Sequence, residues 1–283
     1  MKKISFDDLR GKVCVITGGG GVLGNAICKG MASTGINIAI LDLNGEVAAS
    51  TANAIADEYN VKCIGVAANV LDKASLEEAK KYVLKEFGKV DFLINGAGGN
   101  SPKATTKVEE ITKGNVANLQ DTFFGLEMEG FDFVFNLNFK GTLLPTMVFA
   151  KEMVERGNGV IINISSMNAF RPLTKIAAYS AAKASINNFT EWLSVHFAKA
   201  GVRVNGIAPG FFLTNQNRFL LVDEKTGNPT ARGNKIINGT PMGKYGEPED
   251  LQGTVCFLLS DMSSFITGVT IPVDGGFNAY SGV

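Results

Sequence analysis

Residues 13–24 read VCVITGGGGVLG, and this stretch decides the fold class of the chain. A short run of β-branched and other apolar residues leads directly into four consecutive glycines, and a helix-like segment follows. Glycines let a backbone turn tightly and approach a phosphate, while a helix N-terminus supplies N–H donors and positive potential. At the first strand–helix junction, such a loop is typical of a βαβ unit that binds a dinucleotide.

The same alternation of apolar runs and helical segments continues along the chain. The expected strands are 13–16, 36–41, 63–66, 90–94, 160–164, 202–207 and 269–273, and the expected helices are 22–33, 46–59, 74–87, 131–155, 178–200 and 248–259. Nearly continuous apolar strands are typical of a parallel sheet covered on both faces. We therefore predict an α/β fold of the Rossmann type, with a doubly wound, seven-stranded parallel sheet and a single domain over residues 1–283.

The composition excludes several classes of function. The chain has 27 basic and 27 acidic residues, and this balance argues against global steering toward nucleic acid or an anionic membrane. A single histidine and four scattered cysteines argue against a metal site and favour reduced thiols. The N-terminus lacks the apolar core of a signal peptide, and no apolar run is long enough to span a bilayer. We expect a cytoplasmic protein.

An acidic residue, Asp42, ends the second expected strand. A carboxylate at this position accepts hydrogen bonds from both ribose hydroxyls of adenosine and repels a 2′-phosphate. Neither the glycine loop nor the segment just after Asp42 contains Arg or Lys. We therefore predict NAD, in preference to NADP, as the cofactor. The alternative is that Asp42 caps a helix or is a solvated loop acid.

Three polar residues form a candidate catalytic group. Tyr179 and Lys183 are four residues apart in a helical segment, so both lie on one helix face. A nearby ammonium lowers the pKa of a tyrosine, which lets its hydroxyl exchange a proton at neutral pH. Ser166 follows the strand 160–164, from where its hydroxyl can hydrogen-bond a substrate carbonyl. Taken alone, the Tyr–Lys pair is equally typical of a solvated helix face.

The motifs together resemble a known family. The Thr-Gly-rich loop, Asn95-Gly96-Ala97-Gly98, Asn138, Ser166, Tyr179-x-x-x-Lys183 and Pro209-Gly210 occur in this order. They resemble the classical short-chain dehydrogenases/reductases over residues 9–277. The resemblance implies that Tyr179 is the general acid/base and that Lys183 lowers its pKa and binds the nicotinamide ribose. It also implies that Ser166 polarises the substrate carbonyl and that Asn138 holds a proton-relay water.

The resemblance further implies a cofactor site along the carboxyl ends of the strands. Its expected residues are Gly18, Gly21, Val22, Leu23, Asp42, Asn69, Val70, Asn95, Ala97, Tyr179, Lys183, Pro209, Phe212 and Thr214. The chain departs from the family pattern at Val22, where glycine is usual, and at Asn69, where aspartate is usual. A second glycine register, Gly19-x-Gly21-x-x-Gly24, leaves open how a pyrophosphate sits in the loop.

Two stretches without clear periodicity, about 99–130 and 211–247, follow strand ends, where open α/β sheets bind ligands. We interpret the first as an inserted loop and the second as a substrate loop. The expected substrate-binding residues are Asn100, Ser166, Asn168, Arg171 and Tyr179. Among them, Arg171 is the candidate for binding a carboxylate. The alternative is that Arg171 pairs with an acidic neighbour or sits in solvent.

The stretches NISSMNAFRP at 163–172 and VDGGF at 273–277 narrow the resemblance. They are similar to the short-chain-type D-mannonate oxidoreductases, also called fructuronate reductases, which implies reduction of D-fructuronate by NADH to D-mannonate. The alternatives are a gluconate 5-dehydrogenase or other sugar or polyol dehydrogenase, a 3-oxoacyl reductase of the same family, and a non-catalytic dinucleotide sensor. Family members are usually homotetramers, so we expect this assembly here.

Overall fold

Seven parallel strands form one sheet in the computed structural model, which describes residues 4–214 and 217–282. The strands are β1 (Val13–Thr17), β2 (Asn37–Asp42), β3 (Cys63–Ala67), β4 (Phe92–Asn95), β5 (Gly159–Ile164), β6 (Val202–Pro209) and β7 (Thr270–Val273). Their order across the sheet is β3-β2-β1-β4-β5-β6-β7, so the winding reverses between β1 and β4. The predicted fold class is confirmed, and this reversal is where doubly wound sheets bind ligands.

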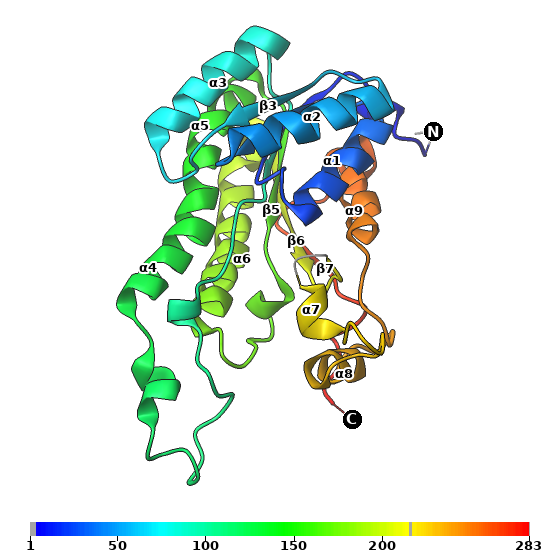
Figure 1. The fold of residues 1–283 in the computed structure, drawn as a ribbon. Coiled ribbons are helices and arrows are strands. Elements are labelled where there is room, and N and C mark those ends of the chain that lie inside the picture. The colour runs from blue at the N-terminus through cyan, green and yellow to red at the C-terminus, as the bar shows by residue number, and fades with distance from the viewer. Residues whose placement is uncertain (1–3, 215–216, 283) are drawn as a thin grey trace.

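Helices cover both faces of the sheet (Figure 1). On one face lie α1 (Val22–Ser33), α2 (Gly45–Tyr59) and α9 (Gln252–Leu259), and on the other lie α3 (Lys73–Phe87), α5 (Gly141–Arg156) and α6 (Ala177–Phe197). Alternate side chains of β1 enter opposite cores, since Ile16 packs with the first set and Val15 with the second. Within the described ranges, every helix is too short or too polar to cross a lipid bilayer.

The helix predicted over 131–155 is interrupted near its start. It consists of α4 (Met128–Phe135), a π-helical segment (Asn136–Lys140) and α5. The side-chain amide of Asn138 donates to the carbonyl of Val134 at 2.8 Å, and the hydroxyl of Thr142 donates to the carbonyl of Asn138 at 2.8 Å. Polar side chains that bond to helix carbonyls distort the regular pattern, and π-helical turns often occur at functional sites.

The two aperiodic stretches form separate parts of the molecule (Figure 1). Residues 99–127, which we call the arm, project away from the sheet and contain turns and short 3₁₀ helices. The described part of residues 211–247, which we call the lobe, contains α7 (Arg218–Leu221) and α8 (Ala231–Asn238). The sequence pattern did not predict these two helices, because four and eight residues are too few to display a clear period.

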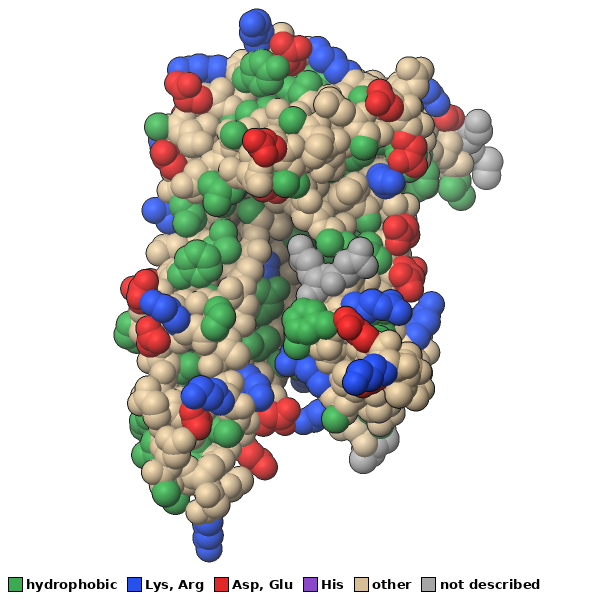
Figure 2. All heavy atoms as spheres, in the orientation of Figure 1, with side chains coloured by type: hydrophobic (Ala, Val, Ile, Leu, Met, Phe, Trp, Pro, Cys, Tyr) green, Lys and Arg blue, Asp and Glu red, His purple; other side chains and the backbone are tan. Residues whose placement is uncertain are grey.

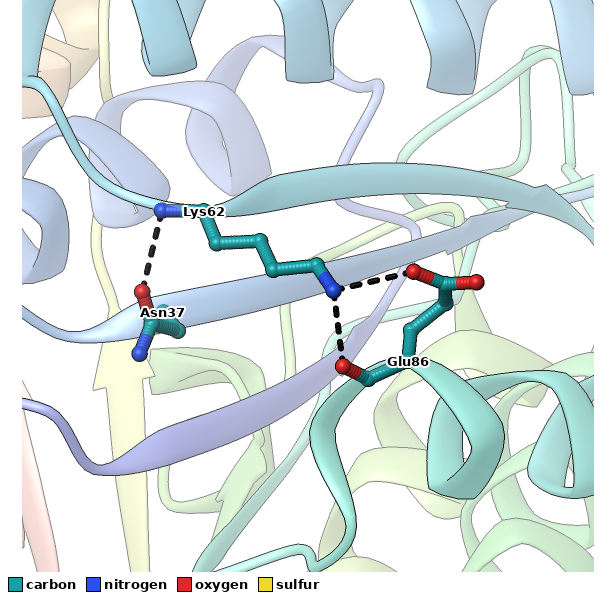
Figure 3. Close-up of polar contacts among 3 residues, drawn as sticks. All are labelled: Asn37, Lys62 and Glu86. Atoms are coloured by element: carbon teal, nitrogen blue, oxygen red, sulfur yellow. Dashed lines mark hydrogen bonds and ion pairs between the residues drawn. The ribbon is translucent and has the colours of Figure 1, made fainter.

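The edge strand β3 is fastened at its amino end by Lys62 (Figure 3). The backbone N–H of Lys62 donates to Asn37 Oδ1 at 2.9 Å. Its Nζ donates to the carbonyl of Glu86 at 2.7 Å and pairs with that residue's carboxylate at 2.9 Å. These contacts join β2, β3 and the end of α3 on the side of the sheet opposite to the strand carboxyl ends, so they serve the fold rather than a site.

Candidate active site

The glycine loop between β1 and α1 is shaped by close backbone packing. Gly18 has a φ of +69°, a conformation that glycine adopts without strain, and its N–H donates to the carbonyl of Leu41 at 2.8 Å. A Cβ on Gly24 would lie 2.3 Å from the carbonyl oxygen of Gly18. Gly21 is the N-cap of α1, and no side chain in the described structure caps this helix end. Its free N–H groups fit an anionic group such as a pyrophosphate.

A pocket of about 770 Å³ opens beside this loop, at the carboxyl ends of the strands. Most of the predicted cofactor residues line it, namely Gly18, Gly21, Val22, Leu23, Asp42, Asn69, Val70, Ala97, Phe212 and Thr214. Pro209 adjoins the pocket through its neighbour Gly210. The volume lies in the range of small-molecule sites, and the lining combines apolar walls with a few polar groups, as cofactor sites do.

Asp42 lies at the end of β2, on the wall of this pocket. Its carboxylate accepts the N–H of Gly20 at 3.2 Å and the N–H of Asn44 at 3.1 Å, which orients it beside the glycine loop. The helix that follows is capped by Asn44, whose side chain accepts from the N–H groups of Glu46 and Val47. Asn44, and not Asp42, therefore caps this helix.

Ser166, Tyr179 and Lys183 come together at the end of β5 and the first turns of α6. The hydroxyl of Ser166 lies close enough to that of Tyr179 to act on the pKa of the phenol, which it lowers. Nζ of Lys183 lies 5.6 Å from the centre of the Tyr179 ring and donates to the carbonyl of Ile164 at 2.8 Å. Only 3% of the Lys183 surface is exposed, so this ammonium is held inside the protein. The predicted catalytic side chains thus face one another.

The pKa of Tyr179 is raised, whereas the sequence pattern predicted a lowered value. Burial of the phenol disfavours its charged form and outweighs the hydrogen bond with Ser166, which acts in the opposite direction. Burial also lowers the pKa of Lys183 to about 8. The tyrosine is therefore held as a neutral proton donor beside a lysine that titrates near pH 8.

Asn138 lies beside this group, at the root of the arm. It is fully buried, and its amide donates to the carbonyl of Gly99 at 2.7 Å and accepts the Gly99 N–H at 3.3 Å. A Cβ on Gly98 would lie 2.6 Å from Asn138 Oδ1 and 3.2 Å from Lys183 Nζ, so the glycine allows both polar groups to approach. The Asn138 side chain anchors the arm, which the sequence did not predict.

Asn95 does not line the pocket, and its side chain instead bonds buried residues next to the site. Its Nδ2 donates to Thr146 Oγ1 at 2.9 Å and to Asn163 Oδ1 at 2.8 Å. Asn163 in turn donates to Thr190 Oγ1 at 2.9 Å, which connects β4 and β5 to α5 and α6. The sequence analysis missed Asn163 and both threonines. The signal for Asn163 was a polar residue inside an apolar strand, which must find a buried partner, whereas the two threonines lie in α5 and α6.

The predicted substrate residues divide into two groups. Asn168 is 4% exposed, its N–H donates to Ser166 Oγ at 3.2 Å, and its Oδ1 has no partner among the described residues. By contrast, Asn100 bonds within the arm, donating to Thr105 Oγ1 at 3.0 Å. Arg171 is exposed, and its Nε donates to the carbonyl of Asn278 at 3.3 Å. The structure thus brings Asn168 to the catalytic group and Arg171 to the C-terminal segment.

Comparison with known proteins agrees with this arrangement. The family model for enoyl-(acyl carrier protein) reductase matches residues 21–278. An uncharacterised oxidoreductase from Haemophilus influenzae is 52% identical over 277 residues, which are 98% of this chain and 96% of that protein. A 2-dehydro-3-deoxy-D-gluconate 5-dehydrogenase from Formosa agariphila is 32% identical over 279 residues, which are 99% of this chain and 97% of that protein.

Solved structures show the same similarity. A Haemophilus influenzae protein, provisionally named a D-mannonate oxidoreductase and solved with bound NAD, is 52% identical with a TM-score of 0.91, over 98% of both chains. A gluconate 5-dehydrogenase from Burkholderia cenocepacia, solved with NADP and tartrate, is 30% identical with a TM-score of 0.82, over 97% of this chain and 99% of that one. Together with the Ser–Tyr–Lys group and the pocket beside the glycine loop, these matches place the chain in the short-chain dehydrogenase/reductase family of oxidoreductases.

Proposed function

We propose that this chain is an NAD-dependent oxidoreductase that interconverts a ketone and a secondary alcohol on a sugar acid, with D-fructuronate, NADH and a proton giving D-mannonate and NAD. The observation that carries the proposal is that Ser166, Tyr179 and Lys183 come together beside a pocket that Asp42 lines, with Gly98 between Lys183 and the pocket. This arrangement suits a small ketone bound next to a dinucleotide.

The residues of the chain have separate tasks in this proposal. Ser166 and Tyr179 hydrogen-bond the ketone oxygen, and Tyr179 transfers its proton to that oxygen as the alkoxide forms. The raised pKa of Tyr179 keeps the hydroxyl protonated for this step, and Lys183 lies close enough to favour the phenolate that remains. NADH, when bound, supplies the hydride from C4 of its nicotinamide ring.

The cofactor is held by groups that are already in position. The N–H groups at the start of α1 bind the pyrophosphate, and the carboxylate of Asp42 binds the adenosine ribose. Asn69 and Thr214 also line this pocket, and they would contact the adenine and the nicotinamide carboxamide of the bound cofactor. The negative charge of Asp42 disfavours a 2′-phosphate, so the proposal includes a preference for NADH over NADPH.

The choice of a sugar acid is supported by the relatives named above and by Asn168. The buried Oδ1 of Asn168 is free to accept a hydrogen bond from a substrate hydroxyl near Ser166. A 3-oxoacyl thioester is the second candidate, because Phe219 and Leu220 of the lobe are exposed at 62% and 45% and offer an apolar surface to an acyl chain.

The assembly and location proposed for this chain are a homotetramer in the cytoplasm. Apolar side chains on α5 and α6, namely Met147, Trp192 and Val195, are exposed at 58%, 58% and 79%, which favours burial against another subunit. Cys14, Cys28, Cys63 and Cys256 are all free thiols, which suits a reducing compartment.

The test follows NADH oxidation at 340 nm with D-fructuronate, 5-keto-D-gluconate and an acetoacetyl thioester, each repeated with NADPH. We expect turnover with D-fructuronate and NADH, and little with NADPH. Turnover with the thioester alone supports the second candidate. If no ketone is reduced while NADH still binds, the proposed reaction is wrong and only the cofactor site stands.

A further inference from the structure

The arm connects the catalytic tyrosine to the lobe. At its root, Ala104 packs in a buried cluster with Ala178 and Tyr179 of α6. Further along the arm, Glu109 forms an ion pair with Lys235 of α8, and this ion pair joins the arm to the lobe. Figure 2 shows the surface hollowed between these two parts, with basic side chains on the lobe facing acidic ones on the arm.

Lys175, a lysine with a strained backbone conformation, lies next to the arm. Lys175 has a φ of +75°, and the other described non-glycine residue with positive φ is Asn60, which ends α2. Asparagine tolerates this conformation, whereas lysine in it costs about 1 kcal/mol. The carbonyl of Lys175 accepts the N–H of Thr106 at 3.0 Å, so the arm holds the strained turn in place.

Lys175 lies close to both the arm carboxylate and the catalytic helix. It lines a pocket of about 310 Å³ together with Glu109 and with Ala177, the first residue of α6, two positions before Tyr179. Residues held in a strained conformation next to catalytic groups often have a functional role. The Lys175 side chain therefore lies between the arm and the start of the catalytic helix.

Three cations surround one carboxylate here. Lys235 is paired with Glu109, and the positive charges of Lys235, Lys175 and Arg232 all lower the pKa of that carboxyl. Arg232 and Lys235 are three residues apart on α8, so they share a face of the helix. Glu109 and Glu110, which line the same pocket, bring two negative charges to these three positive ones, so one positive charge remains for another carboxylate.

We propose that Lys175, Arg232 and Lys235 bind the carboxylate of the substrate, and that Glu109 occupies this cationic cluster until the substrate displaces it. The inference rests on the proposed reduction of a sugar acid and names the residues that select the acid group. Substrate and Glu109 compete for the same cations, so removing the glutamate charge and removing a lysine charge have opposite effects on KM.

The experiment compares a keto acid with its neutral methyl ester, using D-fructuronate and methyl D-fructuronate with NADH. For the acid, Lys235→Gln raises KM about tenfold and Glu109→Gln lowers KM about threefold, while kcat changes less than about twofold in both. For the ester, both variants leave KM unchanged. Lys107→Gln, which removes the ion pair with Asp121 inside the arm, is the matched control and leaves both substrates unaffected.

Two outcomes overturn the inference in distinguishable ways. If both variants change KM in the same direction for acid and ester alike, the ion pair only fastens the arm to the lobe, and the sugar-acid reaction stands without a carboxylate-binding cluster. If the wild-type chain reduces neither acid nor ester although it binds NADH, the proposed function itself is wrong and this inference fails with it. Glu109 and Lys235 are 45% and 68% exposed, so their variants should fold normally.

Discussion

Lys183 and Lys235 belong to the same proposed site and differ in their physical surroundings. Lys183 is 3% exposed, it bonds a backbone carbonyl of β5, and burial lowers its pKa to about 8. Lys235 is 68% exposed and forms an ion pair with a residue of the arm. The first is positioned by the sheet and its covering helices, and the second by two segments that extend beyond the sheet (Figure 1).

The comparison teaches where reaction and selectivity are encoded. Groups that must act on any ketone are carried by rigid elements, which hold a reacting atom precisely. Groups that choose among substrates are carried by loops, where changes of length and charge are tolerated without loss of the fold. The four predictions below test this division, beginning with the largest expected effect.

Replacing Tyr179 with Phe removes the proposed proton donor and leaves the ring in place. We expect kcat for ketone reduction to fall about 10³–10⁴-fold, since general acid catalysis contributes this much. NADH binding, measured by the fluorescence of the bound cofactor, should stay within about twofold. Retained turnover would contradict the assignment of Tyr179. It would also remove the main support for the view that the catalytic groups are carried by rigid elements.

Replacing Lys183 with Met should lower activity and raise stability together. We expect kcat to fall about 10²-fold, because the ammonium beside the phenolate is lost. A folded pKa of about 8 means that the unfolded chain binds more protons between about pH 8 and 10.5, so the contribution of Lys183 to stability rises with pH across this window.

At pH 7 the buried ammonium destabilises the fold, and Lys183→Met should increase the free energy of unfolding by about 1–3 kcal/mol. Urea unfolding of both proteins at pH 7 and pH 10 measures this, and the difference between them should shrink at the higher pH. A variant that is less stable at pH 7 would show that the bond to Ile164 outweighs the cost of burial.

Replacing Asp42 with Asn removes the charge next to the adenosine ribose. We expect KM for NADH to rise about tenfold with little change in kcat, because a charge-assisted hydrogen bond is lost at binding. KM for NADPH should fall, since the repulsion of the 2′-phosphate disappears. An unchanged ratio of the two KM values would show that Asp42 only orients the glycine loop, through its bond to Gly20.

Replacing Lys62 with Ala gives the smallest effect, since this residue fastens the sheet on the side away from the site (Figure 3). We expect a slight decrease in Tm and kcat/KM values within about twofold of the wild type for both acid and ester substrates. A large loss of activity would mean that the contacts of Lys62 at the edge of the sheet affect the active site. The separation between residues that stabilise the fold and residues that act in the site would then be weaker.

The sheet was predictable because its strands are apolar runs between helical segments, and the predicted strands agree with the structure within two residues at each end. The pocket was predictable for the same reason, since Gly18 and Asp42 follow such runs directly. Parallel strands end at one edge of the sheet, so residues that follow them are brought together whatever their separation in sequence.

The remainder depends on contacts that no local pattern carries. The π-helical segment at 136–140 arises from bonds between Asn138, Val134 and the arm, and the raised pKa of Tyr179 arises from burial by several elements. Arg171 was expected at a substrate carboxylate, yet its guanidinium bonds the chain near its C-terminal end. Long-range pairs such as Glu109 with Lys235 cannot be predicted from sequence periodicity.

The bond between Arg171 and Asn278 bears on the order in which the protein is made. Asp274 holds the same segment through the N–H groups of Gly276 and Asn278, and Gly275 accepts the N–H of Met242 from the lobe. During synthesis the glycine loop and the Tyr–Lys helix leave the ribosome long before these residues do. A nascent chain therefore contains the glycine loop and the Tyr–Lys helix before the segment that binds Arg171 and the lobe has been made.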